Sequence, residues 1–203
     1  MRPKNLIIAF ALAIALAAGV FVAARLQTPA SLNTAFLLPA PTPLPAFSLV
    51  DQAGNPVTPD TFRNHWNLVF FGFTHCPDIC PTTLQILAAA RKELVSSGQE
   101  PIPRIVLVSV DPERDSPGVI GRYVDHFGVG NLGITGQLEE LRKLTSSLGV
   151  FFEKQAGDEE NYAVDHYAGV ILINPDAEFH ALFSGPHEVR NFVHDIPLLM
   201  AGR

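Results

Sequence analysis

Cysteine is scarce in this sequence: only Cys76 and Cys80 occur among 203 residues. Exported domains that depend on disulfides use more cysteines and close longer loops with them. A bridge between residues this close in the chain would constrain little of the unfolded state and would stabilise weakly. Redox chemistry or metal binding therefore explains the pair better than an inert structural disulfide, which is the alternative.

The sequence also lacks a cluster of Lys and Arg, and its formal net charge is −6. A protein that binds nucleic acid needs a basic face for the phosphates, so this class of partner is excluded. There is no internal repeat. The length and the 14 Phe suit one domain of ordinary size with a short appendage.

Charge and proline are absent from residues 6–24, which are apolar throughout. A helix of roughly 20 residues spans a bilayer, and the apolar core of a cleaved signal peptide is shorter than this run. We expect a transmembrane anchor at residues 6–24. A cleaved signal peptide is the alternative, because Val22, Ala23 and Ala24 offer small residues at its end.

The charges that flank this run predict its orientation. Arg2 and Lys4 precede it, and the next charged residue after Arg25 is Asp51. The positive-inside rule then places residues 1–5 in the cytoplasm and exports the rest. The expected location is the inner membrane of a bacterium, crossed once, with the soluble domain facing the periplasm.

Four prolines at alternate positions, Pro39 to Pro45, dominate the next segment. Such a run is stiff and extended and is a poor member of a hydrogen-bonded ladder. Residues 25–46 are therefore expected to be a tether, and residues 47–203 the folded domain.

Hydrophobic periodicity and turn signals predict the elements of this domain. The expected elements are a short hairpin around the turn at residues 52–56, strands at 67–73 and 104–110, helices at 82–97, 117–127 and 137–148, a hairpin of 167–173 with 179–183, and a last helix at 187–200 that is interrupted or ends near Pro197. This order predicts the α/β class, with a mixed sheet flanked by helices in a thioredoxin-like architecture with an N-terminal β-hairpin.

The strongest chemical signal is FTHCPDICP at residues 73–81, which lies where a central strand ends and a helix begins. Ligand sites collect at the carboxyl ends of such strands, and a helix N-terminus favours the thiolate form of cysteine. Pro81 suits the first position of the helix, which would leave Cys80 in a cap-like conformation before it. A loop of this size can open its thiolates onto a metal or close them into a disulfide.

A third ligand would let the site hold both Cu(I) and Cu(II), because imidazole suits either oxidation state. The best candidate is His166, expected at the start of a strand, with Asp165 as a residue that could orient its ring. A packed histidine hydrogen-bonded to Asp165 is the alternative. His75 is expected to point away from the thiols and Asp78 to be exposed.

Two further groups of polar residues could be functional, but a structural role is expected for both. Asp111, Glu113, Arg114 and Asp115 resemble a catalytic cluster but are expected to form a solvated loop that caps the next helix. Four other histidines show no ligand spacing and are expected at the surface: His126, His180, His187 and His194.

The chain resembles the Sco/SenC family of copper-binding, thioredoxin-fold proteins. The resemblance rests on FTHCPDICP at 73–81, VDPERDSP at 110–117 and YAVDH at 162–166, whose order and spacing fit the family from about residue 47 to the end. Tyr167 departs from the pattern, since a small hydroxyl residue is common there.

The resemblance implies that Cys76, Cys80 and His166 are copper ligands. It also implies a role in supplying copper to the dinuclear copper centre of cytochrome c oxidase. The implied partners are the copper-centre subunit of that oxidase, a thiol reductant and another copper chaperone, and nothing demands more than a monomer.

Two function classes fit these residues. The first is a metallochaperone, and the second is a thiol–disulfide oxidoreductase that reduces cysteines of an exported protein such as the oxidase subunit. The redox-active pair Cys76 and Cys80 serves both. A histidine ligand at position 166 favours the first, because disulfide exchange needs no imidazole ligand.

Overall fold

The computed structural model describes residues 10, 12–16, 18–19, 31–156 and 162–202. The chain divides into two units, Met1–Ser31 and Leu32–Arg203. Among the described residues, no helix combines the length and the apolar character needed to cross a bilayer. The anchor expected at residues 6–24 and the cytoplasmic segment expected at 1–5 lie largely outside these residues, so both stay predictions.

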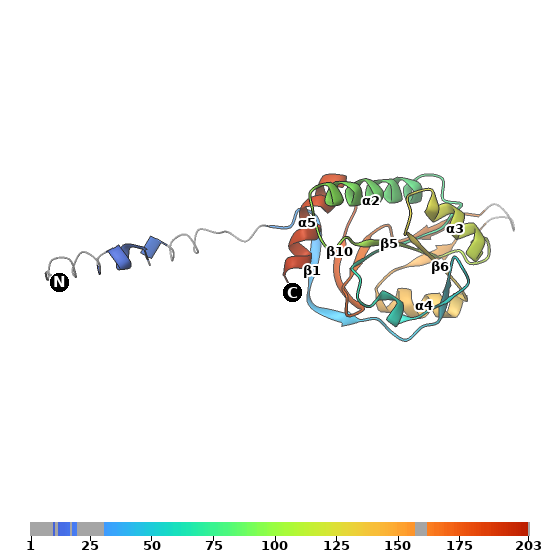
Figure 1. The fold of residues 1–203 in the computed structure, drawn as a ribbon. Helices are drawn as coiled ribbons and strands as arrows, with labels where there is room; N and C mark the ends of the chain where they lie inside the picture. Colours follow the sequence, from blue (N-terminus) through green and yellow to red (C-terminus); the bar gives the residue numbers. More distant parts are fainter. Residues whose placement is uncertain (1–9, 11, 17, 20–30, 157–161, 203) are drawn as a thin grey trace. The chain divides into compact units, whose positions relative to one another are not determined.

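An eight-stranded mixed sheet forms the centre of the second unit (Figure 1). Its strand order is β1-β10-β9-β4-β5-β6-β2-β3. The strands are β1 (Ala35–Pro43), β2 (Leu49–Asp51), β3 (Pro56–Val57), β4 (Asn67–Gly72), β5 (Arg104–Ser109), β6 (Leu132–Thr135), β9 (Val170–Ile173) and β10 (Glu178–Phe183). β4 pairs with β5, and β5 with β6, in parallel, whereas the other pairs are antiparallel. The predicted mixed sheet and hairpins are confirmed.

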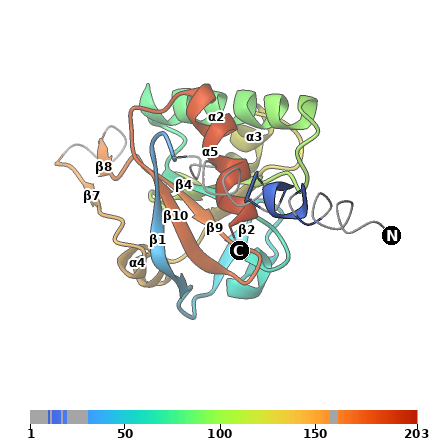
Figure 2. The same ribbon diagram turned by 90° about the vertical axis from the view of Figure 1, so that its left-hand side faces the viewer.

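Helices cover both faces of the sheet (Figures 1 and 2). They are a short 3-10 helix η1 (Pro59–Phe62) and the α-helices α2 (Ile79–Ser96), α3 (Pro117–Asp125), α4 (Leu138–Ser147) and α5 (Val189–Ala201). α2 and α5 lie together on one side, and α4 lies on the other. The central strands β4 and β5 are therefore buried on both faces, which is why they read as continuous apolar runs.

The first strand corrects the predicted tether. Residues 35–43 form β1, an edge strand that pairs with β10, and the compact unit begins at Leu32 rather than at residue 47. Prolines are tolerated here because an edge strand has one side without a ladder partner. The register with β10 breaks between Leu37 and Thr42, where Pro39 and Pro41 lie.

The last helix, α5, agrees with the predicted range of 187–200 but not with the predicted effect of its proline. It runs over Val189–Ala201, and Pro197 neither interrupts it nor ends it. One missing N–H costs a single backbone hydrogen bond, whereas Ile196, Leu199 and Met200 are all buried against the core. Tertiary packing thus decides where this helix ends.

Candidate metal centre

The Cys loop links the end of β4 to the start of α2. Cys80 is the second residue of α2 and is fully buried, and Cys76 is half-buried in the loop before it. The prediction that Cys80 precedes the helix is wrong, because the helix begins at Ile79. Pro81 is still within the first turn, where its missing N–H has no intrahelical partner to lose.

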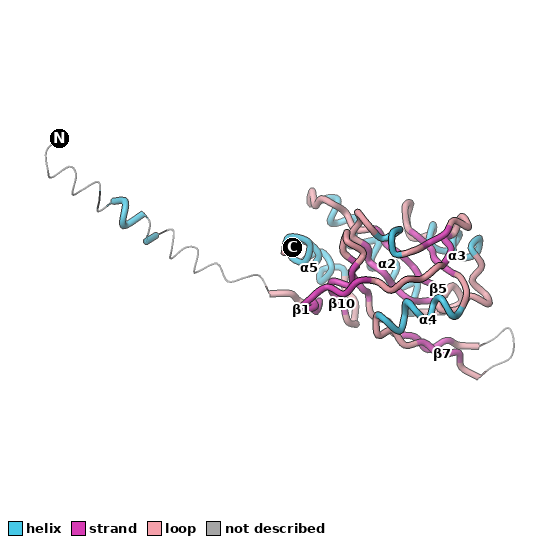
Figure 3. The backbone as a smooth tube through the Cα atoms, turned by 90° about the horizontal axis from the view of Figure 1, so that it is seen from below, coloured by secondary structure: helices cyan, strands magenta, loops and turns pink. Residues whose placement is uncertain are grey.

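His166 reaches the same point from a separate two-stranded ribbon. It is the last residue of β8 (Val164–His166), which pairs with β7 (Phe152–Lys154) outside the main sheet. Both strands are labelled in Figure 2, and β7 is labelled in Figure 3. His166 was expected at the start of a strand. The ribbon register sets Phe152 opposite His166 and so fixes how far the histidine extends toward the Cys loop.

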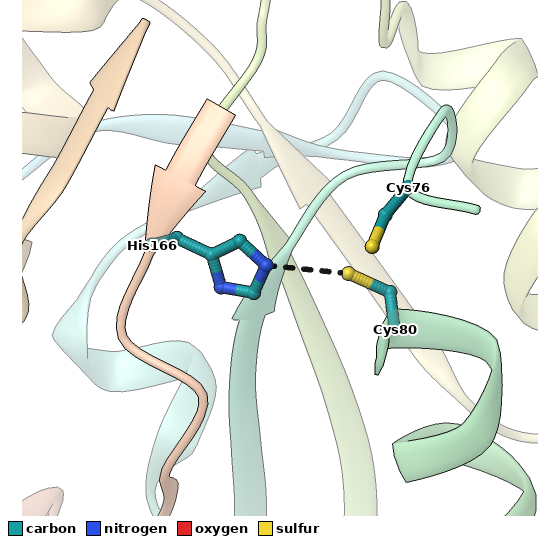
Figure 4. A group of neighbouring side chains, drawn as sticks. All are labelled: Cys76, Cys80 and His166. Atoms are coloured by element: carbon teal, nitrogen blue, oxygen red, sulfur yellow. Dashed lines mark hydrogen bonds between the residues drawn. The ribbon is translucent and has the colours of Figure 1, made fainter. Parts of the chain in front are cut away.

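The three predicted ligands converge (Figure 4). Cys80 Sγ lies 3.5 Å from His166 Nε2, and the ligand atoms of Cys76, Cys80 and His166 all lie within 4.8 Å of one another. Two sulfurs and one imidazole nitrogen at these separations can close on a single ion. Thiolate and imidazole donors favour copper, zinc and other metals that bind sulfur and nitrogen over calcium or magnesium.

Aromatic rings and one carbonyl group orient the His166 ring. The rings of Phe70 and Phe73 each meet it edge to face, with centroids 5.8 Å away. Its Nδ1 lies 3.2 Å from the Tyr167 carbonyl oxygen, which assigns the proton to Nδ1 and leaves the Nε2 lone pair toward the sulfurs. Asp165 was expected to orient the ring, but it is exposed and accepts a hydrogen bond from Gln155 instead.

Burial sets the charge state of the site. It raises the pKa of the Cys80 thiol, and the neighbouring Cys76 adds to this increase. Burial also lowers the pKa of His166. The helix N-terminus was expected to favour the Cys80 thiolate, and burial outweighs it. Without a metal Cys80 is therefore a neutral thiol and His166 a neutral imidazole, and an ion that binds Cys80 must displace its proton.

Gly72 and Tyr123 belong to this neighbourhood, and the sequence analysis missed both. A Cβ at Gly72 would lie 2.9 Å from Cys80 Sγ, so only glycine lets the sulfur rest on the end of β4. The Tyr123 hydroxyl is buried and has no hydrogen-bond partner among the described residues. Burial raises the pKa of Tyr123. The one glycine inside an apolar strand run was the available signal for Gly72.

A buried carboxylate, that of Asp115, stabilises the Cys loop through hydrogen bonds. Asp115 is fully buried and accepts hydrogen bonds from the Thr74 N–H at 3.0 Å, the Thr74 hydroxyl at 2.6 Å and the Ser109 hydroxyl at 2.6 Å. Asp111, also buried, accepts from Tyr162 at 2.6 Å and pairs with Arg114. The expectation of a solvated capping loop is therefore wrong for both aspartates, because each has partners from distant segments.

His75, Asp111 and Asp115 form a second group of potential ligands, with ligand atoms within 4.8 Å of one another. The two carboxylates already accept the hydrogen bonds described above, and the His75 side chain is about half exposed, with Nδ1 3.1 Å from the Thr74 hydroxyl oxygen. His75 lies outside the thiol group, as expected, and Asp78 is exposed.

The other histidines lie away from the thiol group. His126 and His194 are exposed and His187 is half-buried. His180 was expected at the surface but is buried, with Nε2 3.2 Å from the Leu199 carbonyl oxygen and its ring against Trp66. Its position on β10 beneath α5 explains this difference.

The fold and the convergent Cys–Cys–His group define a metal-site protein of thioredoxin-like architecture. A family model described as SCO1/SenC matches residues 39–201, and the chain belongs to this family. The crystal structure of Arabidopsis thaliana ScoI with copper bound matches with a TM-score of 0.73 and 32% identity, covering 79% of this chain and 99% of that one.

Two curated relatives extend the comparison. A candidate copper-binding protein of Stutzerimonas stutzeri is 33% identical over 164 residues, which are 81% of this chain and 80% of that protein. The mitochondrial SCO2 homologue of mouse is 36% identical over 151 residues, which are 74% of this chain and 59% of that protein. The match thus leaves about two fifths of the mouse protein uncovered.

Tyr167, the departure noted from the family pattern, fits without displacing His166. A Cβ at residue 169 would lie 2.3 Å from the Tyr167 ring, so Gly169 makes room for it. The larger side chain is therefore a local packing difference, and the metal-site group is intact.

Proposed function

We propose that this protein is a copper metallochaperone that binds one copper ion through Cys76, Cys80 and His166. The observation that carries the proposal is the convergence of these three side chains, within 4.8 Å of one another, from two separate parts of the fold. Copper-bound structures of family members support the choice of metal. Two thiolates suit Cu(I), and the imidazole adds a ligand that also suits Cu(II).

The bound copper would be delivered to the dinuclear copper centre of cytochrome c oxidase, and the partner would be the oxidase subunit that contains this centre. This role is what membership of the family implies. A thiol reductant and a second copper chaperone would keep the cysteines reduced and supply the metal. We further propose that residues 6–24 anchor a monomer in a bacterial inner membrane, with the metal site in the periplasm.

Thiol–disulfide exchange with the same oxidase subunit is the second candidate, and Cys76 is the observation that favours it. Cys76 is half-buried beside the fully buried Cys80, so its sulfur is the one a partner disulfide can reach. Exchange runs through sulfur alone and assigns no task to His166. The metallochaperone is therefore the better account of the whole group.

The test replaces His166 with Ala and, as the matched control, His75 with Ala. The chaperone account expects oxidase assembly in low copper to fall in the His166 variant, with partial rescue by added copper, and to persist in the control. Cu(II) binding should collapse, and Cu(I) binding should weaken less. Full oxidase assembly by a folded His166→Ala protein in low copper would promote the reductase account instead.

A further inference from the structure

The outer edge of the sheet carries an apolar strip formed by Phe36, Leu37 and the prolines of β1. Phe36 is 60% exposed and Leu37 is 42% exposed, although both lie in a regular strand. No charged residue occurs between Arg25 and Asp51. As consecutive residues of a strand, the two side chains point to opposite faces of the sheet and meet only at its edge. An exposed apolar edge formed by an uncharged segment marks a surface that meets an apolar partner.

The same edge is a poor template for another strand. Pro39, Pro41 and Pro43 have no N–H to donate, and the pairing of β1 with β10 is already broken between Leu37 and Thr42. Prolines at an edge are a common protection against strand addition. The partner of this strip therefore recognises apolar side chains and does not extend the sheet.

A buried carboxylate fixes where the chain enters this edge. Asp195 of α5 accepts hydrogen bonds from the backbone N–H groups of Asn33 at 2.7 Å, Thr34 at 2.9 Å and Ala35 at 2.9 Å. Asp195 itself is fully buried. The first residues of the domain are thus held against α5, and Phe36 follows directly.

The length of chain before this point limits how far the strip can be from the proposed anchor. Eight residues separate Ala24 from Asn33. A fully extended segment of that length spans about 30 Å at most. We propose that the β1 strip rests on the surface of the lipid bilayer, its Phe36 and Leu37 side chains entering the interfacial region.

This proposal rests on the proposed anchor at residues 6–24. The partner is a lipid surface, and the contact is made by apolar side chains. A cavity of about 470 Å³ opens beside β1, and Leu37, Leu38 and Trp66 belong to the apolar part of its wall, which lipid methylene groups could contact. Asp176 and Glu178 also line it, so anionic headgroups are not favoured there. The contact should form on zwitterionic lipid and should resist salt.

The test places a tryptophan on the strip of the full chain. Phe36→Trp is reconstituted in vesicles of phosphatidylcholine with brominated acyl chains, which quench indole by contact. The parent chain, whose own Trp66 is 2% exposed, is measured in the same vesicles, and its emission is subtracted from that of each variant. The matched control is Val129→Trp, because Val129 is 95% exposed and leads into β6, five places away from β1 in the sheet.

The added emission of Phe36→Trp should be largely lost in brominated vesicles, equally in low and high salt, and that of Val129→Trp should persist. Equal quenching of the two variants overturns the proposal, and so does quenching that vanishes in high salt. Flotation of the vesicles separates the two failures. If the protein floats with the vesicles but Trp at position 36 is not quenched, only the proposed contact of the β1 strip with lipid is wrong. If the protein does not float, the proposed anchor and the proposed contact are both wrong.

Discussion

Cys80 Sγ lies 3.5 Å from His166 Nε2, although 86 residues separate the two along the chain. The cysteine is carried by the β4–α2 junction of the main sheet, and the histidine by a separate ribbon of β7 and β8. The proposed metal site is therefore a product of tertiary structure. Substitutions that disturb the junction should weaken copper binding although they change no ligand.

Gly72→Ala should damage the metal site. The new Cβ would lie 2.9 Å from Cys80 Sγ and 2.9 Å from a ring carbon of Phe70, so the sulfur must move. Overpacking of this kind costs about 1–3 kcal/mol, and we expect Cu(I) affinity to fall about tenfold. Competition with a Cu(I) chelator measures this. Gly118→Ala is the control, because its Cβ would contact only the end of the Arg122 side chain, at 3.7 Å. Equal Cu(I) affinity of the two variants would contradict the prediction.

Asp115→Ala should lower the free energy of unfolding by about 3 kcal/mol, because it leaves the donors of Thr74 and Ser109 without an acceptor in a buried site. Urea denaturation measures this change. Asp60→Ala is the control, since Asp60 pairs with Arg63 while its side chain is 83% exposed, and its effect should stay within about 0.5 kcal/mol. If Asp115→Ala lowered the free energy of unfolding as little as Asp60→Ala, the hydrogen bonds of Asp115 would not be needed for stability.

Oxidation of the two cysteines to a disulfide should abolish Cu(I) binding. Both cysteines are free thiols in this structure, and only thiolates ligate copper strongly. The reduced protein should take up one equivalent of Cu(I), and the Cys76–Cys80 disulfide form should take up none. Equilibrium dialysis of the two forms checks this. Tight Cu(I) binding by the oxidised form would place the site elsewhere.

Asp195 should make stability depend on pH in the acid range. Burial alone would raise its pKa, but hydrogen bonds from Asn33, His194, Thr34 and Ala35 outweigh it and hold the pKa below its usual value. A carboxyl with a lowered folded-state pKa stabilises fully above its unfolded pKa of about 3.9, and this stabilisation is lost as the pH falls through the folded value.

Asp195→Asn should therefore be less stable than the parent at pH 7, and the difference should shrink below about pH 4. Urea unfolding at a series of pH values measures both proteins. A difference that stays constant down to pH 2 would mean that the Asn variant loses packing and not a charge-dependent contact.

The sequence predicted the central strands and the Cys motif well because their signals are local. β4 and β5 are buried on both faces and therefore read as unbroken apolar runs, and the Cys loop follows from its place between strand and helix. The resemblance to a family placed His166 with the cysteines, and the geometry agrees.

What the sequence did not predict depends on partners far along the chain. The prolines of β1 indicated a tether, but pairing with β10 makes this segment an edge strand. Asp115 looked like a solvated loop residue, and only its contacts with Thr74 and Ser109 explain its burial. The ribbon of β7 and β8 is short and partly polar, so its periodicity gave no usable signal.

The most direct test of the account is copper K-edge X-ray absorption on the reduced protein loaded with one equivalent of Cu(I). The account predicts a ligand shell of two sulfurs and one imidazole nitrogen, from Cys76, Cys80 and His166. The nitrogen should disappear in His166→Ala and remain in His75→Ala. A shell without sulfur, or a nitrogen that persists in His166→Ala, would contradict the proposed site.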